Sequence, residues 1–410
     1  MGRKDRSSYK GQAPSGTYRT GRDENGRIFL FLKSKPTKSY QYHKRTLSYM
    51  KILYIYSDYK WTGPSQPIVE LCNFMSEKAG VCLLMSTPKR PENRFVAQVR
   101  TDRIHLMQGL QKRGGIRSLI KNRRLILQSI RQVKPDVIHF FRERDLATLP
   151  GNSKNFVKVF SSLKSAYPGR LKRILWNTAN VITVFQKKLH DELLRNSGKV
   201  VYIKPWLDLQ QIPAHHQNVR PAFGLHAEDF VVGLVMRVQP YRRFDLIIET
   251  AKLVKESKKR IKFLLFGKGP YLQKLVMDPL KKYGLEAVII PGGYRKDDYW
   301  DALYSFDIML YTVAGSDGTA RALRQCQAIG KPIVCLHDDF MQEIVRDGVN
   351  GFVVRHDPAE IMKKIDALYS ERNMLIDFSK RSEHQGKTYD LNKIGQEIYA
   401  LYESTLRRKI

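Results

Sequence analysis

From Met50 onward, short apolar runs alternate with amphipathic stretches in a regular order. Residues 51–58 (KILYIYSD) are mostly apolar, a Gly/Pro loop follows, and residues 67–80 then have the apolar spacing of a helix. Apolar runs of the same kind follow at 81–87, 137–141, 180–185 and 200–205, and a further helical stretch lies at 118–133. Buried parallel strands are nearly continuous apolar runs separated by crossover helices. The pattern therefore predicts a doubly wound α/β sheet whose ligands bind at the carboxyl ends of the strands.

The alternation pauses over residues 206–229 and starts again at Phe230. Strands of a second α/β set are predicted at 230–238, 261–267, 287–293, 307–312, 332–336 and 351–354. A helical stretch near the C-terminus, 392–409, has no strand after it. We therefore predict two Rossmann-like domains, 50–206 and 207–386, followed by a terminal helical segment, 387–410.

Residues 1–49 differ from the rest of the chain. They are rich in Gly, Ser and basic residues and lack apolar periodicity, which predicts a disordered extension. The segment has neither a long apolar region nor a small-residue cleavage site, so it is not expected to be a secretory signal. Two interpretations remain open: the segment is a basic arm, or the natural start of the protein is Met50.

Composition narrows the class of protein. The chain has 410 residues, of which 42% are hydrophobic, enough for two globular domains. Its four cysteines show no metal-ligand spacing, and reduced, packed thiols are expected. No apolar run approaches the roughly 20 residues needed to span a bilayer. The formal charge of +33 indicates a polyanionic neighbour such as nucleic acid, an anionic membrane or a phosphorylated substrate.

Polar candidates in the second predicted domain gather where strands end. Arg237 closes a strand and Arg242 precedes a helix, while Gly267, Lys268 and Gly269 form a Gly-x-Gly turn after the next strand. Cations and free backbone N–H groups at a helix start suit a diphosphate. Alone, each segment has a simpler interpretation, as a solvated loop arginine or a turn glycine.

The stretch 315–332 (GSDGTARALRQCQAIGKP) is predicted to be a loop that leads into a short helix. Arg321 and Arg324 fall in its first two turns, where the helix dipole already contributes positive charge. Cations are disfavoured there unless an anion shares the site. Asp317 and Gln325 flank this helix start, eight residues apart.

Four segments in this order resemble the GT-B-fold retaining glycosyltransferases of family four, the "group 1" type. The family's Gly-Arg followed by Lys-Gly corresponds to MRVQPYRRFD, and its strand-Gly-x-Gly-Pro turn corresponds to LLFGKGP. Its Glu-x7-Glu helix with Gly-Lys-Pro-Val corresponds to DGTARALRQCQAIGKPIV, and a later signature corresponds to EIVRDGVNG. The resemblance covers nearly everything after Met50 and is strongest after residue 228.

The resemblance implies two Rossmann-like domains that face a central cleft, with a nucleotide-sugar donor on the second and the acceptor on the first. The terminal helix would cross back to the first domain. Arg237, Arg242 and Asp317 would be catalytic: the two arginines would neutralise the diphosphate, and Asp317 would meet sugar hydroxyls. The expected donor-binding residues are Gly63, Gly267, Lys268, Gly269, Gly318, Thr319, Ala320, Arg321 and Gln325. Arg142, Glu143 and Arg144, at a strand end of the first domain, are the acceptor-side candidates.

This sequence departs from the family pattern at two positions. Asp317 stands for the first family glutamate and is shorter by a methylene, and Gln325 stands for the second and lacks its charge. Arg321 and Arg324 are not part of the family pattern, and we interpret both as additional cations for a phosphate or for the acceptor. Catalysis would rest on cations that stabilise the leaving diphosphate. No metal and no other cofactor are expected, and retention of configuration is implied.

The expected function is transfer of a hexosyl group from a nucleotide sugar to a glycan or lipid-linked acceptor, in cell-envelope or surface-polysaccharide synthesis. The expected location is cytoplasmic, at the inner face of the cell membrane. The basic helical stretch 116–130 would contact anionic lipid, or else would be an ordinary helix with a solvated basic face.

The alternative function is a catalytically degenerate GT-B protein that binds glycan or nucleic acid. Nucleic acid is not the expected partner, because exposed aromatic residues between basic ones are scarce. An epimerase would need cleft carboxylates and a histidine that the sequence does not offer.

Overall fold

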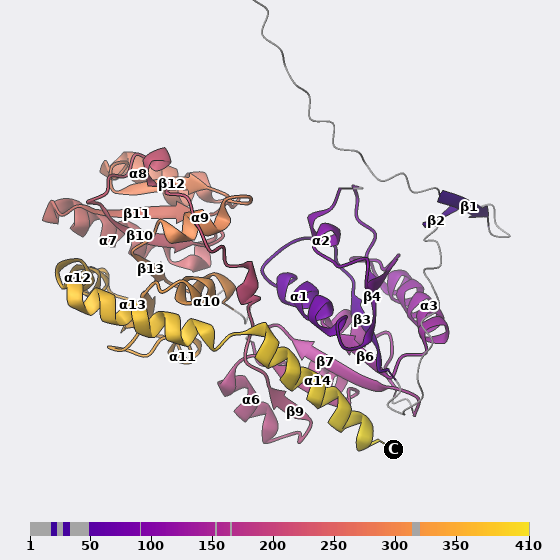
Figure 1. The fold of residues 1–410 in the computed structure, drawn as a ribbon. Coiled ribbons are helices and arrows are strands. Elements are labelled where there is room, and N and C mark those ends of the chain that lie inside the picture. The colour runs from indigo at the N-terminus through magenta and orange to yellow at the C-terminus, as the bar shows by residue number, and fades with distance from the viewer. Residues whose placement is uncertain are drawn as a thin grey trace, which may run out of the picture. The chain divides into compact units, whose positions relative to one another are not determined.

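The computed structural model describes residues 18–22, 28–32, 49–90, 92–151, 154–164, 166–313 and 320–409 (Figure 1). Met1–Ser48 and Tyr49–Ile410 are separate units. In the first unit, strand β1 (Tyr18–Arg22) pairs antiparallel with β2 (Ile28–Leu32). The sequence predicted no regular element in this extension. The remainder of the extension, up to residue 48, lies outside the described residues, and its predicted disorder stays a prediction.

The first sheet of the second unit has seven parallel strands in the order β5-β4-β3-β6-β7-β8-β9. Its strands are β3 (Lys51–Tyr56), β4 (Gly80–Met85), β5 (Ile104–Gln108), β6 (Val137–Phe140), β7 (Val157–Ser162), β8 (Val181–Val184) and β9 (Val200–Tyr202). Its helices are α1 (Gln66–Met75), α2 (Arg94–Ala97), α3 (Ile116–Val133), α4 (Glu143–Leu146), α5 (Arg170–Trp176) and α6 (Lys187–Leu194). Alternate strand residues enter two apolar cores, as expected for a sheet covered on both faces.

The sequence missed two strands of this sheet, β5 and β7. Strand β5 is only partly buried, so it lacks the continuous apolar run of a central strand. Strand β7 carries Lys158, Ser161 and Ser162, all of them buried. The Lys158 ammonium donates to the Leu149 carbonyl at 3.0 Å, so a partner distant in sequence satisfies a side chain that hydropathy assigns to the surface.

The second sheet has six parallel strands in the order β12-β11-β10-β13-β14-β15. Its strands are β10 (Phe230–Val235), β11 (Ile261–Phe266), β12 (Ile289–Gly293), β13 (Ile308–Tyr311), β14 (Ile333–Leu336) and β15 (Gly351–Val354). Its helices are α7 (Phe244–Ser257), α8 (Asp278–Tyr283), α9 (Tyr299–Tyr304), α10 (Arg321–Ala328), α11 (Asp339–Gln342), α12 (Pro358–Ser370) and α13 (Arg372–Lys387). Two apolar cores again cover the sheet.

In each sheet the chain order reverses beside its first strand. The reversal lies between β3 and β6 in the first sheet and between β10 and β13 in the second. Ligands of doubly wound sheets bind outside the carboxyl ends of the strands at such switch points. The predicted fold of two parallel α/β sheets is confirmed, and the two switch points are where a site is expected.

The last helix, α14 (Leu391–Arg407), contacts α1 and β7 of the first sheet (Figure 1). Its Leu391, Ile394 and Ile398 belong to the same apolar core as Ile52 of β3. Around Leu207, backbone hydrogen bonds run from the Leu207 N–H to the Tyr389 carbonyl and from the Leu391 N–H to the Leu207 carbonyl. The helix therefore takes part in the first core although it follows all strands of the second sheet.

A buried polar network joins α14 to the first sheet. The His139 ring of β6 lies 2.6 Å from the Tyr402 hydroxyl through Nδ1 and 2.6 Å from Ser161 Oγ through Nε2. Ser161 Oγ in turn lies 2.5 Å from Thr183 Oγ1. Burial lowers the pKa of His139 to about 3, so the imidazole stays neutral in the folded protein.

Because His139 is buried and neutral, we expect the stability of the fold to decrease at acidic pH. Between about pH 6.5 and pH 3 the unfolded chain binds a proton at His139 that the folded protein does not. The free energy of unfolding should then fall by about 1.4 kcal/mol for each pH unit below 6.5 from this residue alone. Urea unfolding at several pH values measures the slope. In His139→Asn the free energy of unfolding should depend less steeply on pH below 6.5, by up to about 1.4 kcal/mol per pH unit. An equal slope in both proteins would contradict the prediction.

Candidate functional site

Arg242 lies at the switch point of the second sheet. The short turn Pro240–Arg242 follows β10, and the Arg242 guanidinium donates to the carbonyl of Val313, just after β13. Thr312 Oγ1 donates to the Arg242 carbonyl at 2.6 Å, which fixes the turn. The side chain is 9% exposed, and among the residues that the structure describes its Nε–H has no hydrogen-bond partner. A buried donor without a partner costs about 1–3 kcal/mol, so this edge of the guanidinium is suited to an anionic ligand.

Arg237 lies two residues beyond the end of β10. Its side chain is exposed and forms no hydrogen bond or ion pair with any residue that the structure describes. Two arginines thus follow the central strand of the second sheet, one fixed and one available to solvent.

The Gly-x-Gly turn packs against the loop that carries Arg237. A Cβ on Gly267 would lie 1.9 Å from the Met236 carbonyl oxygen, and one on Gly269 would lie 2.1 Å from the Val238 carbonyl oxygen. The Val238 N–H donates to the Lys268 carbonyl at 3.2 Å. Lys268 itself is exposed, with its ammonium 4.0 Å from the centre of the Tyr294 ring. The glycines, predicted from the sequence as donor contacts, therefore have a packing role in this structure: they allow the two loops to touch.

We expect Gly267→Ala to destabilise the protein by about 1–3 kcal/mol, since the added methyl group overlaps the Met236 carbonyl. Nucleotide affinity should fall as well, because the loop with Arg237 must move. Gly198→Ala is the matched control, since a Cβ at Gly198 would meet no atom of the described residues within 4 Å. Urea unfolding and nucleotide titration measure both effects. Equal behaviour of the two variants would contradict this reason for the glycine.

Helix α10 begins at a strained residue. Ala320, its N-cap residue, has φ 43° and ψ 47°, the left-handed region that costs a non-glycine residue about 1–2 kcal/mol. Such strain is found preferentially at functional sites. Asp317, Gly318 and Thr319, which the sequence assigns to the donor, lie outside the described residues, so their roles remain predictions.

Gln325 is buried on α10 and already has a partner. The Tyr299 hydroxyl of α9 donates to Gln325 Oε1 at 2.9 Å. Burial raises the pKa of Tyr299 far above its ordinary value, so the phenol keeps the proton that it donates. The predicted contact of Gln325 with a ribose therefore has to share this oxygen or use the amide nitrogen.

Arg321 has a protein anion as its partner. Its guanidinium forms an ion pair with the Glu70 carboxylate of α1 and donates to the Trp206 carbonyl at 3.4 Å. Both side chains are buried, at 7% and 2% exposure. Glu70 therefore supplies an anion at this helix start. The predicted contact of Arg321 with a phosphate or an acceptor stays a prediction. The signal in the sequence was Glu70, an acid that stands between the apolar pairs Ile68–Val69 and Leu71–Cys72.

Arg324, the second cation of this helix, packs against an aromatic ring. Its guanidinium lies 4.6 Å from the centre of the Tyr389 ring, and the side chain is 4% exposed. Like Arg321, it is buried and contacts another side chain of the protein.

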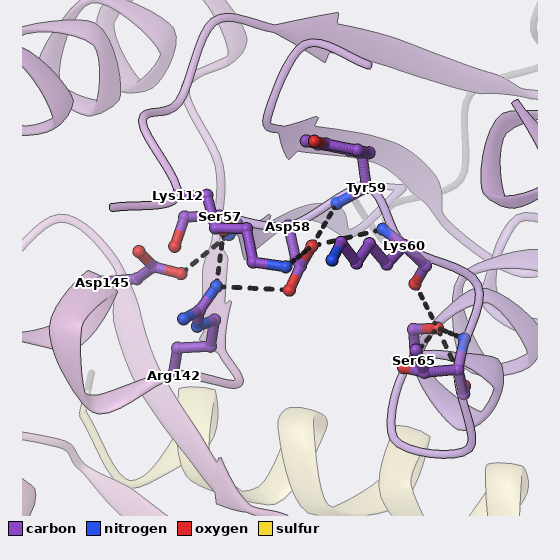
Figure 2. A network of polar contacts seen from close by, with 9 residues as sticks. Ser57, Asp58, Tyr59, Lys60, Ser65, Lys112, Arg142 and Asp145 are labelled. Carbon is purple, nitrogen blue, oxygen red and sulfur yellow. Dashed lines mark hydrogen bonds and ion pairs between the residues drawn. The ribbon is translucent and has the colours of Figure 1, made fainter. Parts of the chain in front are cut away.

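At the switch point of the first sheet, a polar network follows β3 (Figure 2). Lys112 and Arg142 both point toward the Asp58 carboxylate: Lys112 Nζ is 2.6 Å away and Arg142 Nη1 is 3.6 Å away. Arg142 also donates to the Ser57 carbonyl at 2.6 Å. Asp58 further accepts from the backbone N–H groups of Tyr59 and Lys60. Asp58 thus fixes the loop after β3 and holds two cations beside it.

Two buried oxygens at this switch point lack partners within the described part of the chain. The Ser57 N–H donates to Asp145 Oδ2 at 2.9 Å, but no described residue forms a hydrogen bond with Asp145 Oδ1 or Ser57 Oγ. Burial raises the pKa of Asp145, and the hydrogen bond from the Ser57 N–H opposes the shift. Because of these two oxygens and Arg142, the network is a better candidate for the acceptor side than Glu143 and Arg144.

The other acceptor-side candidates are engaged elsewhere. Glu143 pairs with Lys164 at 3.1 Å, and Arg144 donates to the Gly114 carbonyl at 2.7 Å. Of the three predicted residues, only Arg142 joins the network at the switch point.

Gly63 belongs to a turn fixed by Ser65. Ser65 Oγ accepts from the Thr62 N–H at 2.7 Å and donates to the Lys60 carbonyl at 2.8 Å (Figure 2). This turn precedes α1, the helix that carries Glu70. Any donor contact of Gly63 stays a prediction.

Among the residues that the structure describes, no group of three or more His, Cys, Asp or Glu side chains could hold a metal ion. The four cysteines are free and buried.

Solved structures share this fold. HepE of Anabaena, in complex with UDP and glucose, superposes with a TM-score of 0.71 at 16% identity, over 87% of this chain and 100% of that one. A glycosyltransferase of Rickettsia africae gives a TM-score of 0.75 at 13% identity, over 88% and 99%. With its two parallel sheets, the protein is a GT-B-fold protein, as predicted.

The sequence comparison points to the same family as the motifs. Residues 216–385 match the family "Glycosyl transferases group 1". The α-monoglucosyldiacylglycerol synthase of Acholeplasma laidlawii is 22% identical over 331 residues, 71% of this chain and 81% of that enzyme. The poly(ribitol-phosphate) α-N-acetylglucosaminyltransferase of Staphylococcus aureus is 22% identical over 205 residues, 49% of this chain and 39% of that enzyme.

Proposed function

We propose that this protein transfers a hexosyl group, with retention of configuration and without a metal ion, from a nucleotide-diphosphate sugar to a glycan or lipid-linked acceptor. The observation that carries the proposal is Arg242 at the switch point of the group 1 domain, a buried guanidinium with one N–H that no described residue satisfies. A diphosphate oxygen is a strong acceptor for such a donor.

The reaction that these residues suit is cleavage of a bond to a leaving diphosphate. Negative charge grows on the diphosphate as the bond to the sugar breaks. Arg242, fixed by Val313 and Thr312, would meet this charge without reorganising, and the exposed Arg237 would complete the neutralisation. Preorganised cations lower the barrier because the charge is greater in the transition state than in the substrate.

The acceptor class is suggested by the relatives. One is named for a synthase of a glucosylated diacylglycerol and another for glycosylation of poly(ribitol phosphate). The first name contains a lipid and the second a polyol-phosphate polymer, and an acceptor of one of these two kinds is proposed here. It would approach the network of Asp58, Lys112 and Arg142, where the cations suit a phosphate-bearing acceptor.

The test is nucleoside-diphosphate release from a panel of nucleotide sugars, starting with UDP-sugars, since the HepE structure contains UDP. We expect release that depends on an added diacylglycerol, glycolipid or polyol-phosphate acceptor, and a product with the anomeric configuration of the donor. Product of the opposite configuration would refute retention, and loss of activity with EDTA would refute metal independence. Nucleotide binding without release from any donor would support a binding subunit instead.

A further inference from the structure

Two pairs of aliphatic side chains project into solvent from helices of the first sheet. Ile116 and Ile120, at the start of α3, are 76% and 46% exposed; Leu171 and Ile174, on α5, are 82% and 60% exposed. Spacings of four and three residues place each pair on one face of its helix. No apolar partner covers either pair within the described part of the chain.

Helix α4 brings these two helices together. Its Arg144 donates to the Gly114 carbonyl and to Ser118 Oγ, which lies between Ile116 and Ile120 along the first turns of α3. The neighbouring residue, Glu143, lies 3.5 Å from Lys172, which is adjacent to Leu171 on α5. Adjacent residues of one short helix therefore hold the two exposed pairs beside each other. We call the set of Ile116, Ile120, Leu171 and Ile174, with the cations around it, the α3–α5 surface.

The cations of the α3–α5 surface are in large excess. Residues 109–135 contain eight lysines and arginines and no acid, and residues 164–176 contain four and no acid. Arg117, Lys121 and Arg124 are exposed and form no hydrogen bond or ion pair with any described residue. Exposed aliphatic side chains among unpaired cations match an anionic lipid surface in both polarity and charge.

The structure also separates the two sequence interpretations of α3. Ile126 and Ser129 of this helix are buried, and Leu125 and Ile130 pack on the sheet core. The helix is thus an ordinary sheet-covering helix over most of its length, and only its first two turns offer apolar side chains to a partner. Within the described residues, no helix is long and apolar enough to cross a membrane.

We propose that the α3–α5 surface docks this protein on an anionic phospholipid bilayer, with the four aliphatic side chains in the headgroup region and the cations at the lipid phosphates. A nucleic acid would need exposed aromatic rings for stacking, whereas the two projecting pairs are aliphatic. The proposal rests on the proposed function only in one respect: docking on the bilayer would bring the protein close to a lipid-linked acceptor. Binding to lipid is measured without reference to transfer activity.

The test is sedimentation of the full chain with vesicles of phosphatidylglycerol and phosphatidylcholine, compared with phosphatidylcholine alone. We expect binding to the anionic vesicles that is lost at high salt. Arg117→Gln/Lys121→Gln/Arg124→Gln should bind on the order of a hundredfold more weakly, because each basic residue near an anionic surface contributes about fivefold. Ile116→Ser/Ile120→Ser/Leu171→Ser/Ile174→Ser should weaken binding as well and make the remainder more sensitive to salt.

Matched controls remove the same chemistry elsewhere on the surface. Lys281→Gln/Lys363→Gln/Arg372→Gln removes three exposed cations, and Leu194→Ser/Ile376→Ser removes exposed aliphatic side chains; both should bind like the parent protein. Since residues 1–48 are present in every variant, binding through them would leave all variants equal and would overturn the proposal. Binding to neutral vesicles as tight as binding to anionic vesicles would also overturn the proposal. So would a result in which the triple cation variant loses binding to duplex DNA but still binds anionic vesicles like the parent protein. Nucleotide affinity should be the same in all variants; failure of the lipid test with normal nucleotide release would leave the proposed function standing.

Discussion

Arg242→Ala is expected to abolish measurable donor binding and to lower kcat/KM by on the order of 10²–10³-fold, the loss seen when one preorganised donor to a developing anion is removed. The reason is the position of the guanidinium, buried at the switch point of the second sheet with an Nε–H that no residue in the described part of the chain accepts from. Titration with UDP and steady-state kinetics measure the two effects. Unchanged nucleotide affinity would refute the assignment of this residue.

Two further variants separate charge from geometry. Arg242→Lys keeps the charge but loses the planar fork, so we expect it to recover only part of the affinity. Arg243→Ala is the matched control, because Arg243 is bound instead to Asp245 at 2.8 Å and to His356 at 2.9 Å and should leave nucleotide binding unchanged. Thermal unfolding of each variant shows whether loss of the bond to Val313 also affects the fold.

Glu70→Ala is expected to destabilise the protein by about 3–5 kcal/mol, because it leaves the buried Arg321 guanidinium without its counter-charge. The pair connects α1, which follows the loop of the first switch point, with α10, which begins beside the second. The urea midpoint, with its m-value, measures the loss. Nucleotide affinity should not increase if Glu70 is the main partner of the Arg321 guanidinium. Tighter nucleotide binding in Glu70→Ala would instead support the predicted ligand role of Arg321.

The double variant Glu70→Leu/Arg321→Met should lose much less stability than Glu70→Ala, because no buried charge remains unpaired. Glu77→Ala removes the exposed partner of Arg100 just after the same helix and should cost less than about 1 kcal/mol. If the three variants were equally stable, the pair would have no structural role.

Local sequence was sufficient for much of the fold. The apolar runs of β3, β4, β10 and β11 predict strands because a strand buried on both faces has little room for polar side chains. Alternation with helices then fixes a parallel, doubly wound topology, since parallel strands need crossover connections. The same rule places Arg237, Arg242 and the Gly-x-Gly turn at carboxyl strand ends, so the position of a candidate site followed from the sequence.

The partners of polar side chains were decided only by the tertiary structure. Strand β7 was missed because Lys158 is buried against carbonyls that hydropathy does not reveal. Arg142 was selected as a strand-end cation, but its attachment to Ser57 and Asp58 needs β3 and β6 to be neighbours.

Arg321 illustrates the difference. The sequence established that a cation at the start of α10 needs an anion, because helix dipole and guanidinium carry the same sign there. It did not identify that anion, because Glu70 is 251 residues away and Coulomb attraction depends on distance in space rather than along the chain. Periodicity and strand ends are local properties and can be read from the sequence; which charges neutralise one another is decided by packing.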